Sequence, residues 1–230
     1  MKNIKLVYQG FVILSILSIL ISTIPSYSQP VSSTDNEVVL ITGFQPFDSY
    51  DVNPSELVAL ALNDSIIQNV TIKGYVLPVN YTTAPQQMKQ LINQFQPDLI
   101  LCLGLAGNAK KIAVEKLAIN LRINPEARFP LFTLRKINVS GSWFHQATYN
   151  SSKIVHFIQE EDIPVEISYS AGLYLCNAIL YETLQYQKTF GELVPTGFIH
   201  LPPLISQNPE EGMTLETMID AVAAAIISHL

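Results

Sequence analysis

Apolar runs of strand length alternate along the chain with amphipathic stretches of helix length, starting near residue 37. Short apolar runs between turn-forming residues predict buried strands, whereas apolar residues recurring every three or four positions predict helices. The predicted strands are residues 38–42, 71–77, 99–103, 117–121, 165–169 and 197–201. The predicted helices are residues 54–62, 84–95, 151–160, 173–187 and 215–230, several of them starting with Ser, Thr or Pro.

This alternation favours an α/β sandwich with a mainly parallel central sheet. In such sheets, ligands bind beyond the carboxyl ends of the strands, where loops enter the next helix. Residues at these junctions are therefore the first candidates for a site. Residues 129–148 match neither the strand pattern nor the helix pattern of apolar residues, and we interpret them as a long loop or flap with room for a short hairpin.

The first 28 residues have the layout of a secretory signal peptide. Lys2 and Lys5 precede an apolar run over residues 11–21, and Ser26 and Ser28 flank a cleavage point. Residues 29–36 then form a polar tether, and residues 37–230 form one domain. The alternative is an uncleaved membrane anchor, which needs about 20 apolar residues. We expect a secreted, periplasmic or otherwise extracytoplasmic protein, with no stable membrane partner unless the segment stays uncleaved.

Charge narrows the choice of partners. The whole chain has 13 basic and 19 acidic side chains, and removing the two lysines of residues 1–28 leaves a formal charge of −8. An acidic protein of this kind is a poor partner for nucleic acids or anionic membranes. Nothing in the sequence argues against a homo-oligomer.

Cys176 is the candidate nucleophile of the two cysteines. It follows the predicted strand 165–169 and lies in the first turns of the next predicted helix. Free backbone N–H groups and the helix macrodipole stabilise a thiolate there, and the thiolate is the reactive form. A cysteine in an apolar segment is more often a small buried hydrophobe. Cys102, in the middle of a predicted strand, fits that structural role.

A nucleophilic cysteine needs a base and a group that orients the base. His200 ends a predicted strand, on the sheet edge where the Cys176 helix starts, whereas His145, His156 and His229 are interpreted as surface residues. Glu115 could orient the histidine, although a lone glutamate is usually a solvated surface charge.

Eight segments resemble, in order, the pyroglutamyl peptidase I family (pyrrolidone carboxyl peptidases) of cysteine peptidases. They are Thr42-Gly-Phe-Gln-Pro-Phe47, Asn53-Pro-Ser55, Gln96-Pro-Asp98, Gly104-Leu-Ala-Gly107, Glu115-Lys-Leu-Ala-Ile-Asn120, Glu126-Ala-Arg128, Ser170-Ala-Gly-Leu-Tyr-Leu-Cys-Asn177 and Gly197-Phe-Ile-His-Leu-Pro202. The resemblance covers the whole domain and implies a three-layer α/β/α sandwich.

The resemblance also implies a function and a set of site residues. It places a Cys-His-Glu triad on Cys176, His200 and Glu115, which removes N-terminal pyroglutamate from peptides through an acyl-enzyme, without a metal or organic cofactor. It implies that the lactam ring stacks between two aromatic side chains. The substrate-binding residues are then Phe44, Phe47, Asn53, Tyr174 and Arg128.

The chain departs from the family pattern in two regions. After the Gly104–Gly107 turn, Asn108-Ala-Lys110 replaces the usual Gly-Gly-Arg. The family continues the arginine motif with Ile-Pro-Asp-Asn, whereas this chain reads Arg128-Phe-Pro-Leu-Phe, and three extra residues lie between Asn120 and Glu126. The sequence therefore does not determine the shape of the substrate pocket. Two alternatives follow: a non-catalytic binder of capped peptides, and a cysteine amidase acting on another N-acyl substrate.

Overall fold

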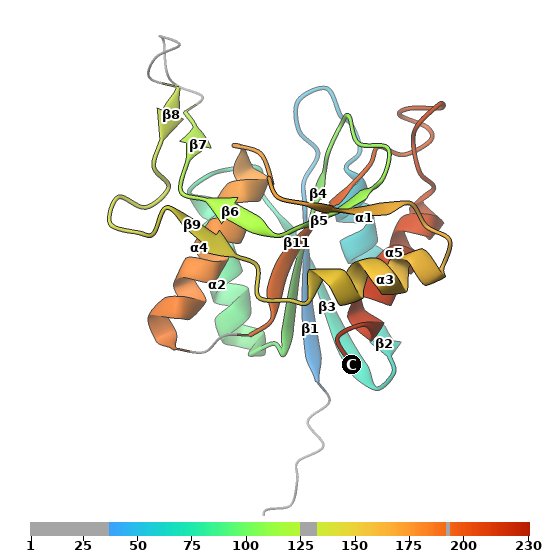
Figure 1. The fold of residues 1–230 in the computed structure, drawn as a ribbon, viewed down its shortest axis with the longest axis horizontal. Coiled ribbons are helices and arrows are strands. Elements are labelled where there is room, and N and C mark those ends of the chain that lie inside the picture. The colour runs from blue at the N-terminus through green and yellow to red at the C-terminus, as the bar shows by residue number, and fades with distance from the viewer. Residues whose placement is uncertain (1–36, 125–132, 192–193) are drawn as a thin grey trace, which may run out of the picture. The chain divides into compact units, whose positions relative to one another are not determined.

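The structure is a computed structural model that describes residues 37–124, 133–191 and 194–230. Within these ranges a seven-stranded sheet has the order β10-β5-β11-β4-β1-β3-β2 (Figure 1). Its parallel centre consists of β11 (Thr196–Leu201), β4 (Leu99–Leu105), β1 (Val38–Phe44) and β3 (Val70–Leu77). The short β2 (Ile66–Ile67) runs antiparallel to β3.

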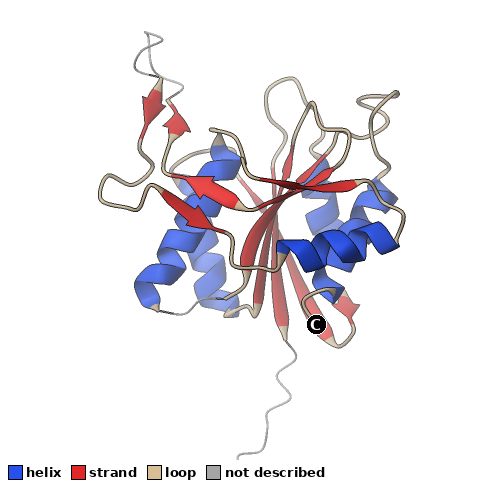
Figure 2. Ribbon diagram, viewed as in Figure 1, coloured by secondary structure: helices blue, strands red, loops and turns tan. Residues whose placement is uncertain are grey.

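Two further strands extend the sheet beyond β11. The strand β5 (Ile112–Glu115) runs antiparallel to β11, and β10 (Val165–Ser168) runs parallel to β5. Two small sheets lie outside this one: β6 (Leu117–Ile119) pairs with β9 (Phe144–Gln146), and β7 (Arg122–Ile123) pairs with β8 (Leu134–Arg135). Figure 2 shows both small sheets beside the main one.

Helices cover both faces of the sheet, which gives the three layers. On one face lie α1 (Pro54–Leu62), α3 (Ser151–Glu160) and α5 (Leu215–Ile227), and on the other lie α2 (Thr83–Phe95) and α4 (Leu175–Phe190) (Figure 2). The predicted sandwich with a mainly parallel sheet is confirmed.

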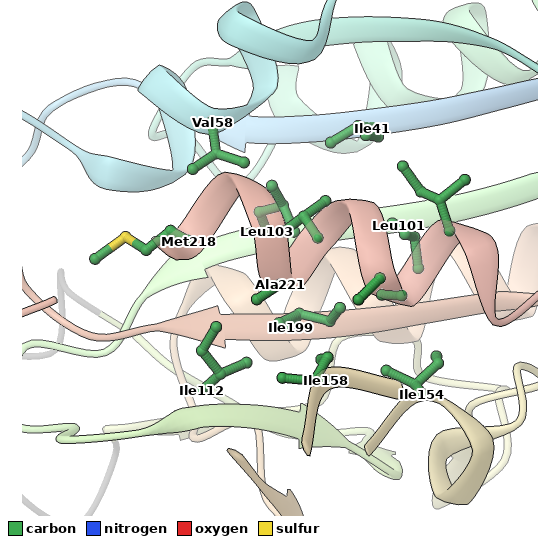
Figure 3. Packing of buried hydrophobic residues seen from close by; sticks show 14 of the residues in the cluster. Ile41, Val58, Leu101, Leu103, Ile112, Ile154, Ile158, Ile199, Met218 and Ala221 are labelled. Atoms are coloured by element: carbon green, nitrogen blue, oxygen red, sulfur yellow. The ribbon is translucent and has the colours of Figure 1, made fainter. Parts of the chain in front are cut away.

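The strands are continuous apolar runs because both of their faces are buried. Successive side chains point to opposite faces, so Ile41 and Leu101 join the core under α1, α3 and α5, as Figure 3 shows. Their neighbours Leu40 and Ile100 join the core under α2 and α4. Two separate apolar cores therefore fix the sheet between the helix layers.

The helix predictions are confirmed to within a few residues, and three helices have a side-chain cap. Thr214 accepts a hydrogen bond from the Thr217 N–H at the start of α5. Asn53 accepts a hydrogen bond from the Ser55 N–H at the start of α1, and Asn150 accepts one from the Lys153 N–H at the start of α3. Such side chains satisfy backbone donors that the first helical turn leaves without partners. Proline at the first position of α1 fits the same site, because its missing N–H would have had no partner.

The strand predictions need one correction. Residues 117–121 were predicted as a core strand, but only Leu117–Ile119 forms a strand, and it pairs with β9 outside the main sheet. The main sheet contains Ile112–Glu115 instead, where Ile112 and Val114 are fully buried. This four-residue strand is too short to stand out by its apolar pattern.

The predicted flap is partly structured. Its described part, residues 133–148, holds β8 and β9, but each strand pairs with an earlier segment of the chain, so these described residues do not form a hairpin of their own. The predicted signal segment 1–28, the tether 29–36 and Arg128 lie outside the described residues. In the ranges that are described, no helix combines the length and the apolar character that crossing a membrane requires.

Candidate active site

Cys176 is the second residue of α4, as predicted from the sequence. The helix begins at Leu175, and Tyr174 is its N-cap, with an extended backbone and no side-chain cap hydrogen bond. The first N–H groups of a helix have no intrahelical acceptor. The half-buried thiol therefore lies where backbone donors and the positive end of the helix dipole favour negative charge.

Strand register brings the predicted base and its orienting carboxylate together. Glu115 on β5 lies directly opposite Phe198 on β11, so Glu115 and His200, two residues further on, project from the same face of the sheet. Diagonal neighbours of this kind are within reach of long side chains. The Glu115 Oε1 atom lies 2.7 Å from His200 Nδ1, and the two residues are 2% and 8% exposed.

The charge state of His200 follows from these neighbours. Burial alone would lower the pKa of the imidazole, but negative charge on Cys176, a hydrogen bond with its sulfur and the contact with Glu115 raise it to about 10. At neutral pH the imidazolium form of His200 is therefore favoured. An imidazolium beside a thiolate is the form of a cysteine-histidine pair that can attack a carbonyl carbon.

Gly104 on β4 leaves room for the thiol. It is paired with His200 across the two strands. A Cβ atom at position 104 would lie 2.9 Å from the Cys176 Sγ and 2.7 Å from the Phe198 Cζ. A side chain at this position would push the Cys176 sulfur away from His200.

We expect the Gly104→Ala substitution to lower kcat at least about 10-fold, because small displacements of a reacting group cost large factors in rate. The measurement is steady-state kinetics, with circular dichroism to confirm an intact fold. Unchanged kcat in a folded variant would show that the space beside Gly104 is not needed for catalysis.

A pocket of about 490 Å³ opens beside Cys176. Four of the predicted site residues, Phe44, Phe47, Asn53 and Tyr174, line it together with the thiol. The rest of its wall is Asp48, Val79, Tyr81, Leu105 and Leu175. The pocket is thus mainly apolar and aromatic, and its single carboxylate lies in the exposed loop that follows Phe47.

Phe198 contacts both the pocket wall and His200. Its ring stacks on Phe44 with 6.5 Å between centroids and lies 4.8 Å from the His200 ring. Phe44 and Phe198 are both buried, whereas Tyr174 is 64% exposed at the pocket mouth. The aromatic wall is therefore buried on its inner side and exposed to solvent on its outer side.

Asn53 has structural partners besides its place in the pocket. Its Oδ1 accepts hydrogen bonds from the Ser55 N–H at 3.1 Å and the Ser55 hydroxyl at 2.8 Å, and its Nδ2 donates to the Gln45 carbonyl at 3.1 Å. The sequence predicted a polar contact to the substrate. The structure shows that the same amide also fixes the loop between β1 and α1, which carries Phe47.

Two residues around the site were not singled out from the sequence. The Tyr149 hydroxyl lies 2.7 Å from the Glu115 carbonyl oxygen and 2.9 Å from that of Phe198, and its ring occupies the space where a Cβ of Gly197 would lie. A glycine inside a strand often marks such a close approach, so Gly197 was the available clue.

Asn177 is the second missed residue. Its side chain accepts from the Ile119 N–H and donates to the carbonyls of Ile119 and Leu121, at 2.8 to 2.9 Å. These three bonds tie the start of α4 to the segment that follows Glu115. Nothing in the local sequence pattern distinguishes this role, because the partner is 56 to 58 residues away.

The remaining cysteine and histidines are mostly as predicted. Cys102 is fully buried, and burial raises the pKa of its thiol to about 12, as expected for a structural residue. His156 and His229 are exposed. His145 was predicted at the surface and is buried instead. Its ring packs against Tyr181 with 4.7 Å between centroids, and its Nε2 lies 3.0 Å from the Gln185 Oε1.

The described residues contain no group of side chains suited to a metal ion.

An α/β/α sandwich that holds a helix-start cysteine, a buried histidine and a carboxylate beside a pocket defines the class of α/β cysteine hydrolases. Comparison with known proteins narrows the class further. The family model described as pyroglutamyl peptidase matches residues 37–230. The chain belongs to the pyroglutamyl peptidase family.

Individual relatives agree with this assignment. The chain is 35% identical to the pyrrolidone-carboxylate peptidase of Halalkalibacterium halodurans over 72% of this chain and 83% of that protein. It is 33% identical to that of Thermococcus litoralis over 82% of this chain and 90% of the relative. The solved structure of the Thermococcus litoralis pyrrolidone carboxyl peptidase superposes with a TM-score of 0.77 at 32% identity, covering 84% and 92% of the two chains.

Proposed function

We propose that this protein is a cysteine peptidase that removes N-terminal pyroglutamate from peptides. The observation that carries the proposal is the 2.7 Å contact between His200 and Glu115, on the same side of the sheet as Cys176 and its aromatic pocket. A protein that only bound capped peptides would have no need of a nucleophile, a base and an orienting carboxylate together.

The proposed chemistry starts from the thiolate-imidazolium pair. Cys176 Sγ attacks the pyroglutamyl carbonyl carbon, and backbone N–H groups at the start of α4 stabilise the oxyanion. The C–N bond then breaks as the leaving amine takes a proton from His200. Water then gives a proton to His200 and attacks the thioester carbonyl carbon, and the C–S bond breaks, which releases pyroglutamate and restores the thiolate-imidazolium pair. Glu115 keeps the imidazole oriented and stabilises its cation throughout.

The pocket suits the pyroglutamyl ring. The ring is flat, uncharged and lacks a free amine, so it gains little from a carboxylate and more from apolar faces. We propose that it binds between Phe44 and Phe47. Asn53 and the mouth residue Tyr174 add polar and aromatic contacts. Arg128 is proposed as a further contact from its place in the family motif alone.

The test is release of a fluorescent amine from a pyroglutamyl amide by the purified mature chain under reducing conditions. We expect turnover, and none with the matched prolyl amide, whose ring carries a charged amine in place of the lactam N–H and carbonyl. Absence of turnover by folded protein would instead favour an altered N-acyl substrate, for which the departure from the family pattern after Arg128 is the available support, or a binding role.

We also propose that residues 1–28 direct export and are then removed, so that the mature chain begins at Gln29. The proposal rests on the basic, apolar and small-residue order of this segment. The mass of the chain recovered outside the cytosol tests it. A full-length mass in the membrane fraction would indicate an anchor instead.

A further inference from the structure

Arg122 is a cation that lies against Tyr81, a residue of the pocket wall, and the proposed chemistry does not use it. Its guanidinium carbon lies 4.4 Å from the centre of the Tyr81 ring, and Tyr81 lines the pocket together with Cys176. The next residue, Ile123, donates a backbone hydrogen bond of 2.8 Å to the Leu173 carbonyl, just before α4 begins. The strand β7 is thereby fixed beside the helix end that carries the nucleophile.

The electrostatics of Tyr81 agree with this placement. Burial raises the pKa of its hydroxyl, the positive charge of Arg122 counteracts that rise, and negative charge on Cys176 adds to it. The same phenol thus responds to both charges. Tyr81 thus lies between the two groups, with Arg122 over its ring and Cys176 in the same pocket wall.

Arg122 has no acidic partner in the described ranges. The ion pairs found there involve other cations, such as Lys73 with Asp64 and Lys89 with Glu182. Its neighbour directly across the antiparallel pair is a second arginine, Arg135. Like charges opposite one another destabilise a strand pair, and a bound anion would relieve that repulsion.

The interval that contains Arg122 differs from the family pattern in length. The residue lies between Asn120 and Glu126, the interval that has three residues more than the family pattern. Figure 1 shows β7 and β8 projecting from the body of the domain near the start of α4. A cation in this altered interval, against the pocket wall, points to a role in substrate preference.

We infer that Arg122 binds a carboxylate on the part of the substrate that follows the pyroglutamyl residue. This inference rests on the proposed function. The lactam itself is uncharged, so only the remainder of the peptide can supply the anion, either as an acidic side chain or as the free C-terminus of a short peptide. A planar guanidinium is well suited to hold a carboxylate through two parallel hydrogen bonds.

Two matched substrate pairs test the inference and separate the two sources of the carboxylate. The first pair is pyroglutamyl-alanine and pyroglutamyl-alanine amide; the second is pyroglutamyl-glutamate amide and pyroglutamyl-glutamine amide. We expect the acidic member of at least one pair to have about 10-fold higher kcat/KM, the size typical of a charge-assisted hydrogen bond. The ratio should fall as salt is raised, because the contact lies near solvent.

Variants of Arg122 test whether this residue causes the preference for acidic substrates. Arg122→Gln should bring the acidic-to-neutral ratio close to one, and Arg122→Lys should give an intermediate ratio, because it keeps the charge and loses the planar fork. The matched control is Lys153→Gln, which removes another cation above an aromatic ring, that of Phe157 at 5.6 Å on α3, on the opposite layer. This control should keep the full ratio.

The failure of this inference is distinguishable from the failure of the proposed function. Equal kcat/KM within both pairs, with all four substrates turned over, would overturn the role of Arg122 and leave the peptidase activity standing. A preference that survives Arg122→Gln would overturn it as well. Absence of turnover on every pyroglutamyl substrate would overturn the proposed function, and this inference with it.

Discussion

Replacing Cys176 with alanine should abolish release of amine from a pyroglutamyl amide while the protein stays folded. Cys176 supplies the one thiol among the described residues that line the pocket, and removal of a nucleophile typically costs factors of about 10³ to 10⁶ in kcat. The side chain is only half-buried, so its loss opens little space in the core. The measurement is turnover of the variant beside its thermal unfolding curve.

Cys102→Ala is the matched control for this prediction. It removes the other thiol, which is fully buried in β4, and we expect a stability loss of about 1 kcal/mol with turnover retained. Retained turnover in the Cys176→Ala protein would remove Cys176 from the role of nucleophile. Loss of turnover in both variants would point to damage to the shared core instead.

Replacing Glu115 with glutamine should lower kcat about 10²-fold or more and change the pH profile. A glutamine amide can donate to His200 Nδ1, which stabilises the wrong tautomer of the imidazole. The substitution also removes a negative charge that helps raise the pKa of His200 to about 10. That pKa should fall, because a cation next to a neutral amide is less stable than one next to a carboxylate.

The pH prediction has a definite sign. In the unmodified protein, activity on the alkaline side is lost as the imidazolium gives up its proton, near the pKa of about 10. In Glu115→Gln this alkaline limb of kcat/KM should move to lower pH, as measured across pH 6 to 11. Glu166→Gln, a surface carboxylate on the neighbouring strand β10, should leave the limb in place. An unmoved limb in Glu115→Gln would contradict its coupling to His200.

The sequence predicted the helices well because their limits are encoded locally. Asn53 followed by Pro54, and Asn150 three residues before Lys153, are caps that a reader can find without knowing the fold. The start of α4 and the end of β11 were equally readable, so Cys176 and His200 could be assigned to one edge of the sheet.

The features that the sequence did not predict depend on pairing between segments that are far apart in the chain. Whether Glu115 faces His200 is decided by the antiparallel register of β5 against β11, and a shift of one residue would turn its side chain to the opposite face. No local pattern carries that register. The burial of His145 and the contacts of Tyr149 were missed for the same reason, since their partners come from elements far along the chain.

Because the two thiols have different surroundings, their reactivity reports whether the protein is folded. Cys102 is sealed inside the sheet, whereas Cys176 opens into the pocket. Each folded molecule should thus react with one equivalent of a mild alkylating reagent, at Cys176. A second equivalent should react, at Cys102, only after the chain unfolds. The same titration reports, in a single sample, how many molecules are competent to react and how many have lost their native form.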